Sequence, residues 1–145
     1  VIDPHYLSEF ARTQPPSAGH RPGVLVVDDS AGVRKLIGAP LAGAGFDVTV
    51  AGGAREAVER LAEVPTDALV VDYSMPRSSG VDLVRALRAA GVDIPIVMVS
   101  GVATPEEQRA AWEAGVDAYM DKFDLRKGVL TTTLRRLLAE NVAAR

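Results

Sequence analysis

The sequence contains no cysteine, no long run of apolar residues and no excess of positive charge. Without cysteine there is no disulfide, no thiolate nucleophile and no cysteine-bound zinc. The apolar runs stay far below the 18 or so residues that a membrane span needs, so we expect no membrane partner. With 16 Lys and Arg against 19 Asp and Glu and no basic stripe, we expect no nucleic-acid partner either.

The 145 residues are enough for one domain that buries its own core without a structural metal. Residues 13–23 hold three prolines and two glycines among small polar residues, a composition typical of a linker. We therefore place the folded domain at residues 23–145 and interpret residues 1–22 as the tail of a preceding domain followed by a linker. Because the chain starts at Val1 rather than Met, we expect it to be a piece of a larger protein.

Short apolar runs alternate with longer amphipathic stretches along the predicted domain. The clearest runs are 24–27, 68–71 and 94–99, and weaker ones lie at 47–51 and 117–120. Runs rich in β-branched residues and apolar on both faces are typical of parallel strands that helices cover on both sides. Because strand and helix alternate five times, the pattern predicts an α/β fold with a doubly wound, five-stranded parallel sheet.

Amphipathic spacing predicts helices at 54–64, 79–90, 104–114 and 125–140. The third of these starts with a capping Thr104, a proline and two acids, and the last has a buried stripe of Leu130, Leu134, Leu137 and Leu138. A further helix begins after Ser30 but contains Pro40. Because proline costs about 3 kcal/mol in a helix interior, we expect a kink or an early end there.

Chemically matched side chains stand where the predicted strands end. These positions are Asp28, Asp29, Asp72, Ser100 and Lys122, and only three of the 16 basic residues are lysines. In an open parallel sheet, ligands bind beyond the carboxyl ends of the strands. Three carboxylates brought to one crevice repel one another unless a divalent cation or an ammonium compensates, and oxygen ligands suit Mg²⁺. A single Asp at such a position more often caps a helix or opens a turn, but the combination points to a site.

These residues resemble the receiver domains of two-component response regulators, the chemotaxis CheY type included. Four segments carry the resemblance: VLVVDDS at 24–30, DYSMPRSSG at 72–80, VMVSG at 97–101 and AYMDK at 118–122. Their order and spacing match over residues 23 to about 140. The resemblance implies a flavodoxin-like, CheY-like sheet with strand order 2-1-3-4-5.

The resemblance also implies roles for the site residues. Asp72 would accept a phosphoryl group from the phosphohistidine of a partner histidine kinase. Mg²⁺ would be held by the carboxylates of Asp28, Asp29 and Asp72 and by the backbone carbonyl of Ser74. Lys122 would pair with a phosphoryl oxygen.

A switch is implied as well. Ser100 stands at the family's Ser/Thr switch position, and its hydroxyl would bind the phosphoryl group after a loop movement. Tyr119 stands at the position of the switch aromatic and is expected to turn inward when Ser100 moves, although tyrosine is also an ordinary strand former. Signalling would then change the face made by the fourth helix, fifth strand and fifth helix.

One departure from the family concerns the residue after the lysine, which is usually proline in a cis peptide but here is Phe123. A cis bond before a non-proline residue costs about 2.5 to 4 kcal/mol, so we expect a trans peptide. The sequence Lys122-Phe123-Asp124 resembles receivers at the carboxyl end of CheA-type hybrid chemotaxis kinases. Residues 1–7 are similar to the closing segment of a CheW-like domain, so upstream kinase and CheW-like domains of the same chain are expected partners, and the location is expected to be cytoplasmic.

Other interpretations remain open at this point. A phosphorylation-independent interaction or autoinhibitory domain on the same fold is motivated by Phe123 and by the interrupted first helix. A haloacid-dehalogenase-like phosphatase is disfavoured, because its two acids would be separated by one residue, whereas Asp28 and Asp29 are adjacent. Enzymatic activity is at most the domain's own phosphorylation chemistry. Trp112 is either a core residue or a partner contact, and His5 and His20 are interpreted as spacer residues.

Overall fold

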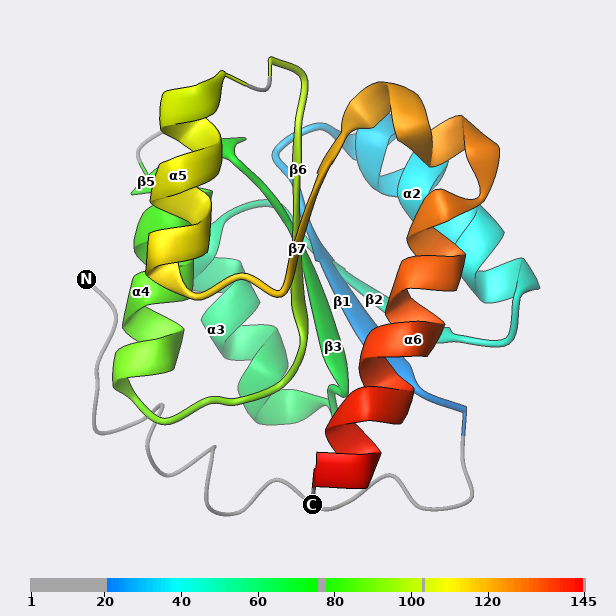
Figure 1. The fold of residues 1–145 in the computed structure, drawn as a ribbon. Helices are drawn as coiled ribbons and strands as arrows, with labels where there is room; N and C mark the ends of the chain where they lie inside the picture. Colours follow the sequence, from blue (N-terminus) through cyan, green and yellow to red (C-terminus); the bar gives the residue numbers. More distant parts are fainter. Residues whose placement is uncertain (1–20, 76–77, 103, 145) are drawn as a thin grey trace.

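The computed structural model describes residues 21–75, 78–102 and 104–144. Five parallel strands form one sheet in the order β2-β1-β3-β6-β7, which confirms the predicted α/β fold and, counted along the chain, the order 2-1-3-4-5 (Figure 1). Their bounds are β1 Gly23–Val27, β2 Asp47–Ala51, β3 Ala68–Asp72, β6 Ile96–Ser100 and β7 Ala118–Asp121. Two further strands of two residues each, β4 Ser74–Met75 and β5 Ser78–Ser79, pair antiparallel to each other and were not predicted.

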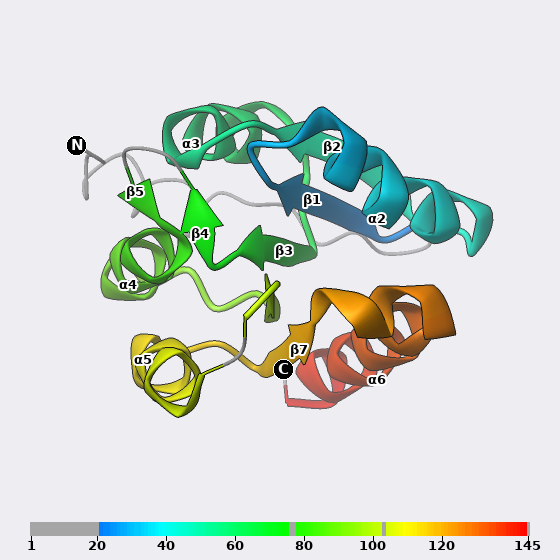
Figure 2. The ribbon, with the colours of Figure 1, turned by 90° about the horizontal axis from the view of Figure 1, so that it is seen from above.

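Helices cover both faces of the sheet. Viewed from above, α3 (Ala54–Glu63), α4 (Gly80–Ala89) and α5 (Pro105–Ala114) lie on one side, and α2 (Ala31–Gly43) and α6 (Val129–Ala144) on the other (Figure 2). A 3₁₀ helix, η1 (Lys122–Lys127), connects β7 to α6. Among the described residues, no helix is both long and apolar enough to cross a membrane.

The core consists of one apolar cluster on each face of the sheet. In β1, Leu25 and Val27 pack in the cluster under α3, α4 and α5, whereas Val24 and Val26 pack in the cluster under α2 and α6. All five residues of β1 are buried, as are those of β3 and β6. Because successive side chains of a strand point to opposite faces, strands covered on both sides must be apolar throughout, which is the pattern seen in the sequence.

Of the two outcomes expected at Pro40, a kink or an early end of the first helix, the early end is wrong. Helix α2 runs through Pro40 to Gly43, one turn beyond the predicted end. Pro40 lies on the exposed side of the helix, while Ile37 and Leu41 are buried against the sheet. Proline removes one helical hydrogen bond near the end of the helix, and the packing of the buried residues on either side outweighs that loss.

The last helix starts later than predicted. Instead of one helix from Leu125, the chain forms η1, breaks at Gly128 and continues as α6 from Val129. Gly128 has φ of 70°, a left-handed conformation that glycine adopts without steric cost. The predicted apolar stripe is present, with Leu130, Leu134 and Leu137 buried and Leu138 packed against them.

Candidate functional site

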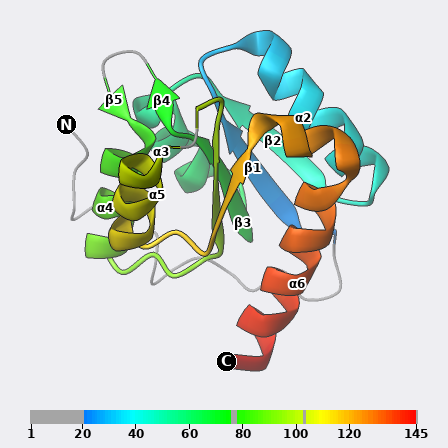
Figure 3. The ribbon, with the colours of Figure 1, turned by 45° about the horizontal axis from the view of Figure 1, so that its top comes forward.

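The three predicted acids lie together at the carboxyl edge of the sheet. Asp28 and Asp29 follow β1, and Asp72 is the last residue of the neighbouring strand β3. Each offers a carboxylate oxygen, and these atoms all lie within 4.8 Å of one another. Asp28 and Asp72 are only 1% and 4% exposed, whereas Asp29 faces solvent. Figure 3 shows this edge of the molecule coming forward.

Local hydrogen bonds fix the loop that carries the first acid. Asp28 Oδ1 accepts a hydrogen bond from the backbone N–H of Ser30 at 2.9 Å, and Ser30 in turn caps α2. The guanidinium of Arg34, one turn into α2, donates to the Asp28 carbonyl at 2.7 Å. The only signal for Arg34 in the sequence is its place four residues after the cap, which puts it within reach of the preceding loop.

The second buried acid is fixed by close packing. Asp72 Oδ1 accepts from the N–H of Ser74 at 3.4 Å. Gly80 packs against the same strand end so closely that an added Cβ would lie 2.1 Å from the Asp72 carbonyl oxygen. Only glycine allows α4 to begin so near β3. The family-type Gly80 in the sequence therefore has a steric role in placing Asp72.

Lys122 supplies the counter-charge. Its Nζ lies 3.4 Å from Asp72 Oδ1 and 3.5 Å from Asp28 Oδ2. Burial and the neighbouring charge of Asp28 raise the pKa of Asp72 above its ordinary value, and the ammonium of Lys122 opposes this rise. Burial lowers the pKa of Lys122, but the carboxylates of Asp72 and Asp28 outweigh that effect, so the pKa is raised.

The acid cluster suits a small divalent cation. Asp28 Oδ2 is buried and accepts no hydrogen bond from the part of the chain that the structure describes, although it forms an ion pair with Lys122. One ammonium cannot balance three carboxylates, and carboxylate oxygens with remaining waters are the ligands that Mg²⁺ prefers. Ser74 donates its N–H toward Asp72, and its carbonyl stays a predicted ligand.

Ser100 is 4% exposed and ends β6, beside the strand that carries Asp72. Its hydroxyl oxygen lies 2.8 Å from the Val102 carbonyl and 3.2 Å from Oε2 of Glu107, and it accepts from the Val102 N–H at 3.2 Å. The structure thus places Ser100 at the predicted carboxyl edge of the sheet, where its hydroxyl forms hydrogen bonds with the following loop and with α5. The sequence predicts Glu107 only as an acid in the first turn of a helix.

Tyr119 is half-buried in β7, and its ring packs against the α3, α4 and α5 side of the core. Its hydroxyl is buried and has no hydrogen-bond partner among the described residues. Burial raises the pKa of Tyr119 above its ordinary value. The Ser100 hydroxyl opposes this rise and the charge of the Glu107 carboxylate adds to it, although neither group forms a hydrogen bond with the Tyr119 hydroxyl. Tyr119 lies on β7, which pairs with the strand that ends in Ser100, and Ser100 in turn contacts Glu107.

The loop after the lysine differs from the family in a defined way. Cis peptide bonds are absent among the described residues, so the bond between Lys122 and Phe123 is trans. The N–H of Phe123 donates to Asp121 Oδ1 at 2.9 Å, and this bond caps η1. Proline has no N–H and could not make this bond. The Phe123 side chain is 77% exposed.

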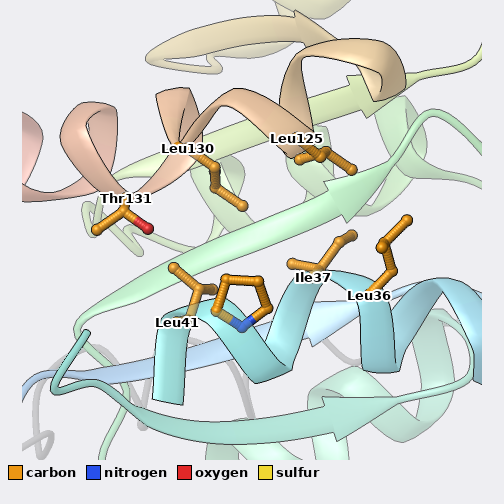
Figure 4. Close-up of a pocket in the computed structure, with 8 residues that line it drawn as sticks. Leu36, Ile37, Leu41, Leu125, Leu130 and Thr131 are labelled. Carbon is orange, nitrogen blue, oxygen red and sulfur yellow. The ribbon is translucent and has the colours of Figure 1, made fainter. Parts of the chain in front are cut away.

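A separate apolar cavity of about 180 Å³ lies between α2 and the η1–α6 segment (Figure 4). Its lining contains no titratable side chain, so it offers no acid, base or nucleophile. The lining residues are Leu36, Ile37, Pro40, Leu41, Leu125, Gly128, Leu130 and Thr131.

Trp112 is 51% exposed on α5, so the interpretation of Trp112 as a core residue is wrong. His5 and His20 lie outside the described residues.

Comparison with known proteins identifies the family that combines this fold with acids at the strand ends. A family model described as response regulator receiver domain matches residues 24–135. The chain therefore belongs to the response regulator receiver domain family, whose members accept a phosphoryl group from histidine kinases and generally bind Mg²⁺ at an acidic pocket.

Particular relatives agree with this assignment. Response regulator MprA of Mycolicibacterium vanbaalenii is 37% identical over 116 residues, which cover 79% of this chain and 49% of the relative. MprA of Mycobacterium bovis is 36% identical over 123 residues, 83% of this chain and 54% of the relative. The chain thus spans about half the length of the curated relatives it matches.

Solved structures show the same fold. Chemotaxis protein CheY4 of Vibrio cholerae has a TM-score of 0.72 at 29% identity, covering 80% of this chain and 98% of that one. The receiver domain of the Francisella response regulator 1452 has a TM-score of 0.75 at 26% identity, covering 83% and 98%.

Proposed function

We propose that Asp72 accepts a phosphoryl group from the phosphohistidine of a histidine kinase, and that this chain works as a phosphorylated switch. The observation that carries the proposal is the buried Asp72 carboxylate, which faces the Lys122 ammonium at 3.4 Å and shares an edge with two further acids. A lone capping aspartate would have no reason to be buried with two like charges and one counter-charge.

The reaction is a transfer between two nucleophiles. A carboxylate oxygen of Asp72 forms a bond to phosphorus while the bond between phosphorus and the imidazole nitrogen breaks, and its electron pair stays on the imidazole. Lys122 would shift from Asp72 to a phosphoryl oxygen. Asp28, Asp29, Asp72 and the Ser74 carbonyl would hold Mg²⁺, which when bound supplies positive charge against the phosphoryl oxygens.

The same proposal assigns the switch residues. The Ser100 hydroxyl would leave its present partners and bind the phosphoryl group, and Tyr119 would respond to that movement. The surface that changes would be the one made by α5, β7 and α6, which contains the exposed Trp112. This surface is the proposed route to a partner.

For the wider context we propose the carboxyl-terminal receiver of a CheA-type hybrid chemotaxis kinase, located in the cytoplasm. The support is the sequence Lys122-Phe123-Asp124 and the similarity of residues 1–7 to the end of a CheW-like domain. In this proposal residues 1–22 are the tail and linker, residues 23–145 are the receiver, and kinase and CheW-like domains of the same chain are partners.

The phosphorylation-independent alternative has lost part of its support. One motive for it was an interrupted first helix, and α2 continues through Pro40. The other was Phe123 after the lysine, yet Lys122 contacts both buried acids. The geometry therefore favours the phosphoacceptor.

The test is incubation with acetyl phosphate and Mg²⁺, followed by intact mass measurement. We expect a mass increase of one phosphoryl group, its loss when EDTA replaces Mg²⁺, and its loss in Asp72→Asn. Asp93→Asn, which removes an exposed carboxylate elsewhere, is the matched control and should label normally. No labelling under conditions that modify a known receiver would favour the alternative, and labelling of Asp72→Asn would show that another residue is the acceptor.

A further inference from the structure

The Ser100 hydroxyl is held by groups that belong to the loop after β6 and to α5. It has one hydrogen to donate, and two acceptors compete for it: the Val102 carbonyl at 2.8 Å and Glu107 Oε2 at 3.2 Å. It also accepts the Val102 N–H at 3.2 Å. None of these partners belongs to the three-acid cluster. The Ser100 hydroxyl therefore forms its hydrogen bonds on the side of the site where α5 begins.

Glu107 is itself fixed by the start of α5. Its N–H donates to Oγ1 of the capping Thr104 at 3.2 Å, with Pro105 between them as the first helical residue. The amino end of a helix stabilises a negative charge, which favours a carboxylate at this place. Glu106, in the same turn, is exposed, whereas Glu107 is half-buried beside Ser100. The two neighbouring acids therefore differ in contact, although both lie in the first turn of α5.

The Tyr119 hydroxyl takes no part in the contact between Ser100 and Glu107. It is buried without a hydrogen-bond partner among the described residues, and both Ser100 and Glu107 lie near enough to affect its pKa. A buried unpaired hydroxyl is unfavourable. In the conformation described here, Ser100 rather than Tyr119 has the contact with Glu107.

We propose that Glu107 is a positioning residue that holds the Ser100 hydroxyl on the α5 side of the site, away from Asp72. The proposal rests on the phosphoacceptor function proposed above, since Ser100 has a second position to reach only if Asp72 is phosphorylated. A phosphoryl group on Asp72 then competes with Glu107 for the same hydroxyl. Glu107 thus biases the domain toward its unphosphorylated conformation.

The first experiment needs no phosphoryl donor. Scalar couplings between Hα and Hβ of Ser100, measured by NMR on the 145-residue chain, report whether its side chain keeps one rotamer. We expect a single rotamer in the wild type and in Glu106→Ala, and rotamer averaging in Glu107→Ala. If Glu107→Ala retains the wild-type couplings, Glu107 does not hold the hydroxyl and the proposal is overturned.

The second experiment measures binding of beryllofluoride with Mg²⁺ by fluorine NMR. Because a hydrogen bond to a charged group must be given up on activation, Glu107→Ala should bind about three- to tenfold more tightly than the wild type, and Glu106→Ala should not differ. In a Ser100→Ala background the gain should disappear. The same gain in that background would mean that Glu107 acts by charge alone, and no gain in either background would likewise overturn the proposal.

The two experiments separate the two claims. If the wild type binds no beryllofluoride, the phosphoacceptor function fails, and the rotamer of Ser100 still decides whether Glu107 positions it. If the wild type binds and Glu107→Ala behaves like Glu106→Ala in both experiments, the function stands and the role of Glu107 is refuted.

Discussion

Replacing Lys122 by Met should destabilise the domain, and the loss should be smaller when Mg²⁺ is present. Methionine keeps most of the apolar stem of lysine but removes the ammonium, which lies 3.4 Å from Asp72 and 3.5 Å from Asp28. At an effective dielectric constant of about 20, each of these pairs is worth about 4 to 5 kcal/mol before desolvation is subtracted.

Desolvation and solvent screening reduce this value. The Lys122 side chain is 30% exposed while both carboxylates are almost fully buried, so the ammonium keeps part of its hydration. Removing one partner of a fully buried pair costs about 3 to 5 kcal/mol, and partial exposure puts this substitution at about 2 to 3 kcal/mol. The carboxylates left behind repel each other, and a cation bound to them should recover part of the loss.

Urea denaturation at pH 7 in EDTA, compared with the same titration in Mg²⁺, measures this effect. The matched control is Lys35→Met, which removes an exposed lysine of α2 and should change the free energy of unfolding by less than about 0.5 kcal/mol. If Lys122→Met unfolds at the same urea concentration as the wild type in EDTA, Lys122 does not compensate the acids. Equal destabilisation with and without Mg²⁺ would show that the lost stability is unrelated to charge.

The effect should also depend on pH. Burial and Asp28 raise the pKa of Asp72 above 3.8, so this acid takes up its proton at a higher pH than in the unfolded chain. The difference between wild type and Lys122→Met should therefore shrink as the pH falls through that raised value. At high pH, the pKa of Lys122 is raised above 10.5, so its contribution is complete below 10.5 and is lost only as the pH rises through the folded-state pKa.

Two further predictions concern backbone placement. Gly80→Ala should destabilise the domain by more than about 2 kcal/mol and slow labelling by acetyl phosphate, because the new Cβ would collide with the backbone of Asp72. The control is Gly43→Ala, whose new Cβ would meet open space, so this change should leave the stability unchanged or raise it. Thermal unfolding measures the stability of both variants, and mass measurement follows their labelling. Asp121→Ala should lower the labelling rate and cost about 1 kcal/mol of stability by removing the cap on the Phe123 N–H, and Asp121→Asn should largely restore both. Normal labelling in Asp121→Ala would mean that the cap does not position the lysine.

The sheet could be predicted because its three central strands, β1, β3 and β6, are buried on both faces. That geometry forces apolar runs such as 24–27 and 68–71, which no other element of this size needs. The candidate site followed from the same fact, since a charged residue directly after such a run must stand at the edge of the sheet. Asp28, Asp72 and Lys122 were predicted in this way, and the structure brings them together.

Features that depend on packing between distant segments could not be predicted. The persistence of α2 through Pro40 reflects burial of Ile37 and Leu41 against the sheet, which outweighs the local preference of proline. The contact between Glu107 and Ser100 joins a helix start to a strand end and has no periodic signal. Gly128 did carry a local signal for the break before α6, since a glycine inside an apolar stripe is a candidate helix end.

The order of the strands means that Lys122 connects the edge strand of the sheet to its centre. Lys122 follows the edge strand β7, and β6 separates that strand from β3, whose end carries Asp72. With neighbouring strands about 4.8 Å apart, the side chains of Lys122 and Asp72 together bridge a distance of about 10 Å across the end of β6. The lysine therefore acts as a tether between the edge and the centre of the sheet. Any change in the charge on Asp72 changes the attraction on the Lys122 ammonium, and Lys122 directly follows β7, the strand that contains Tyr119.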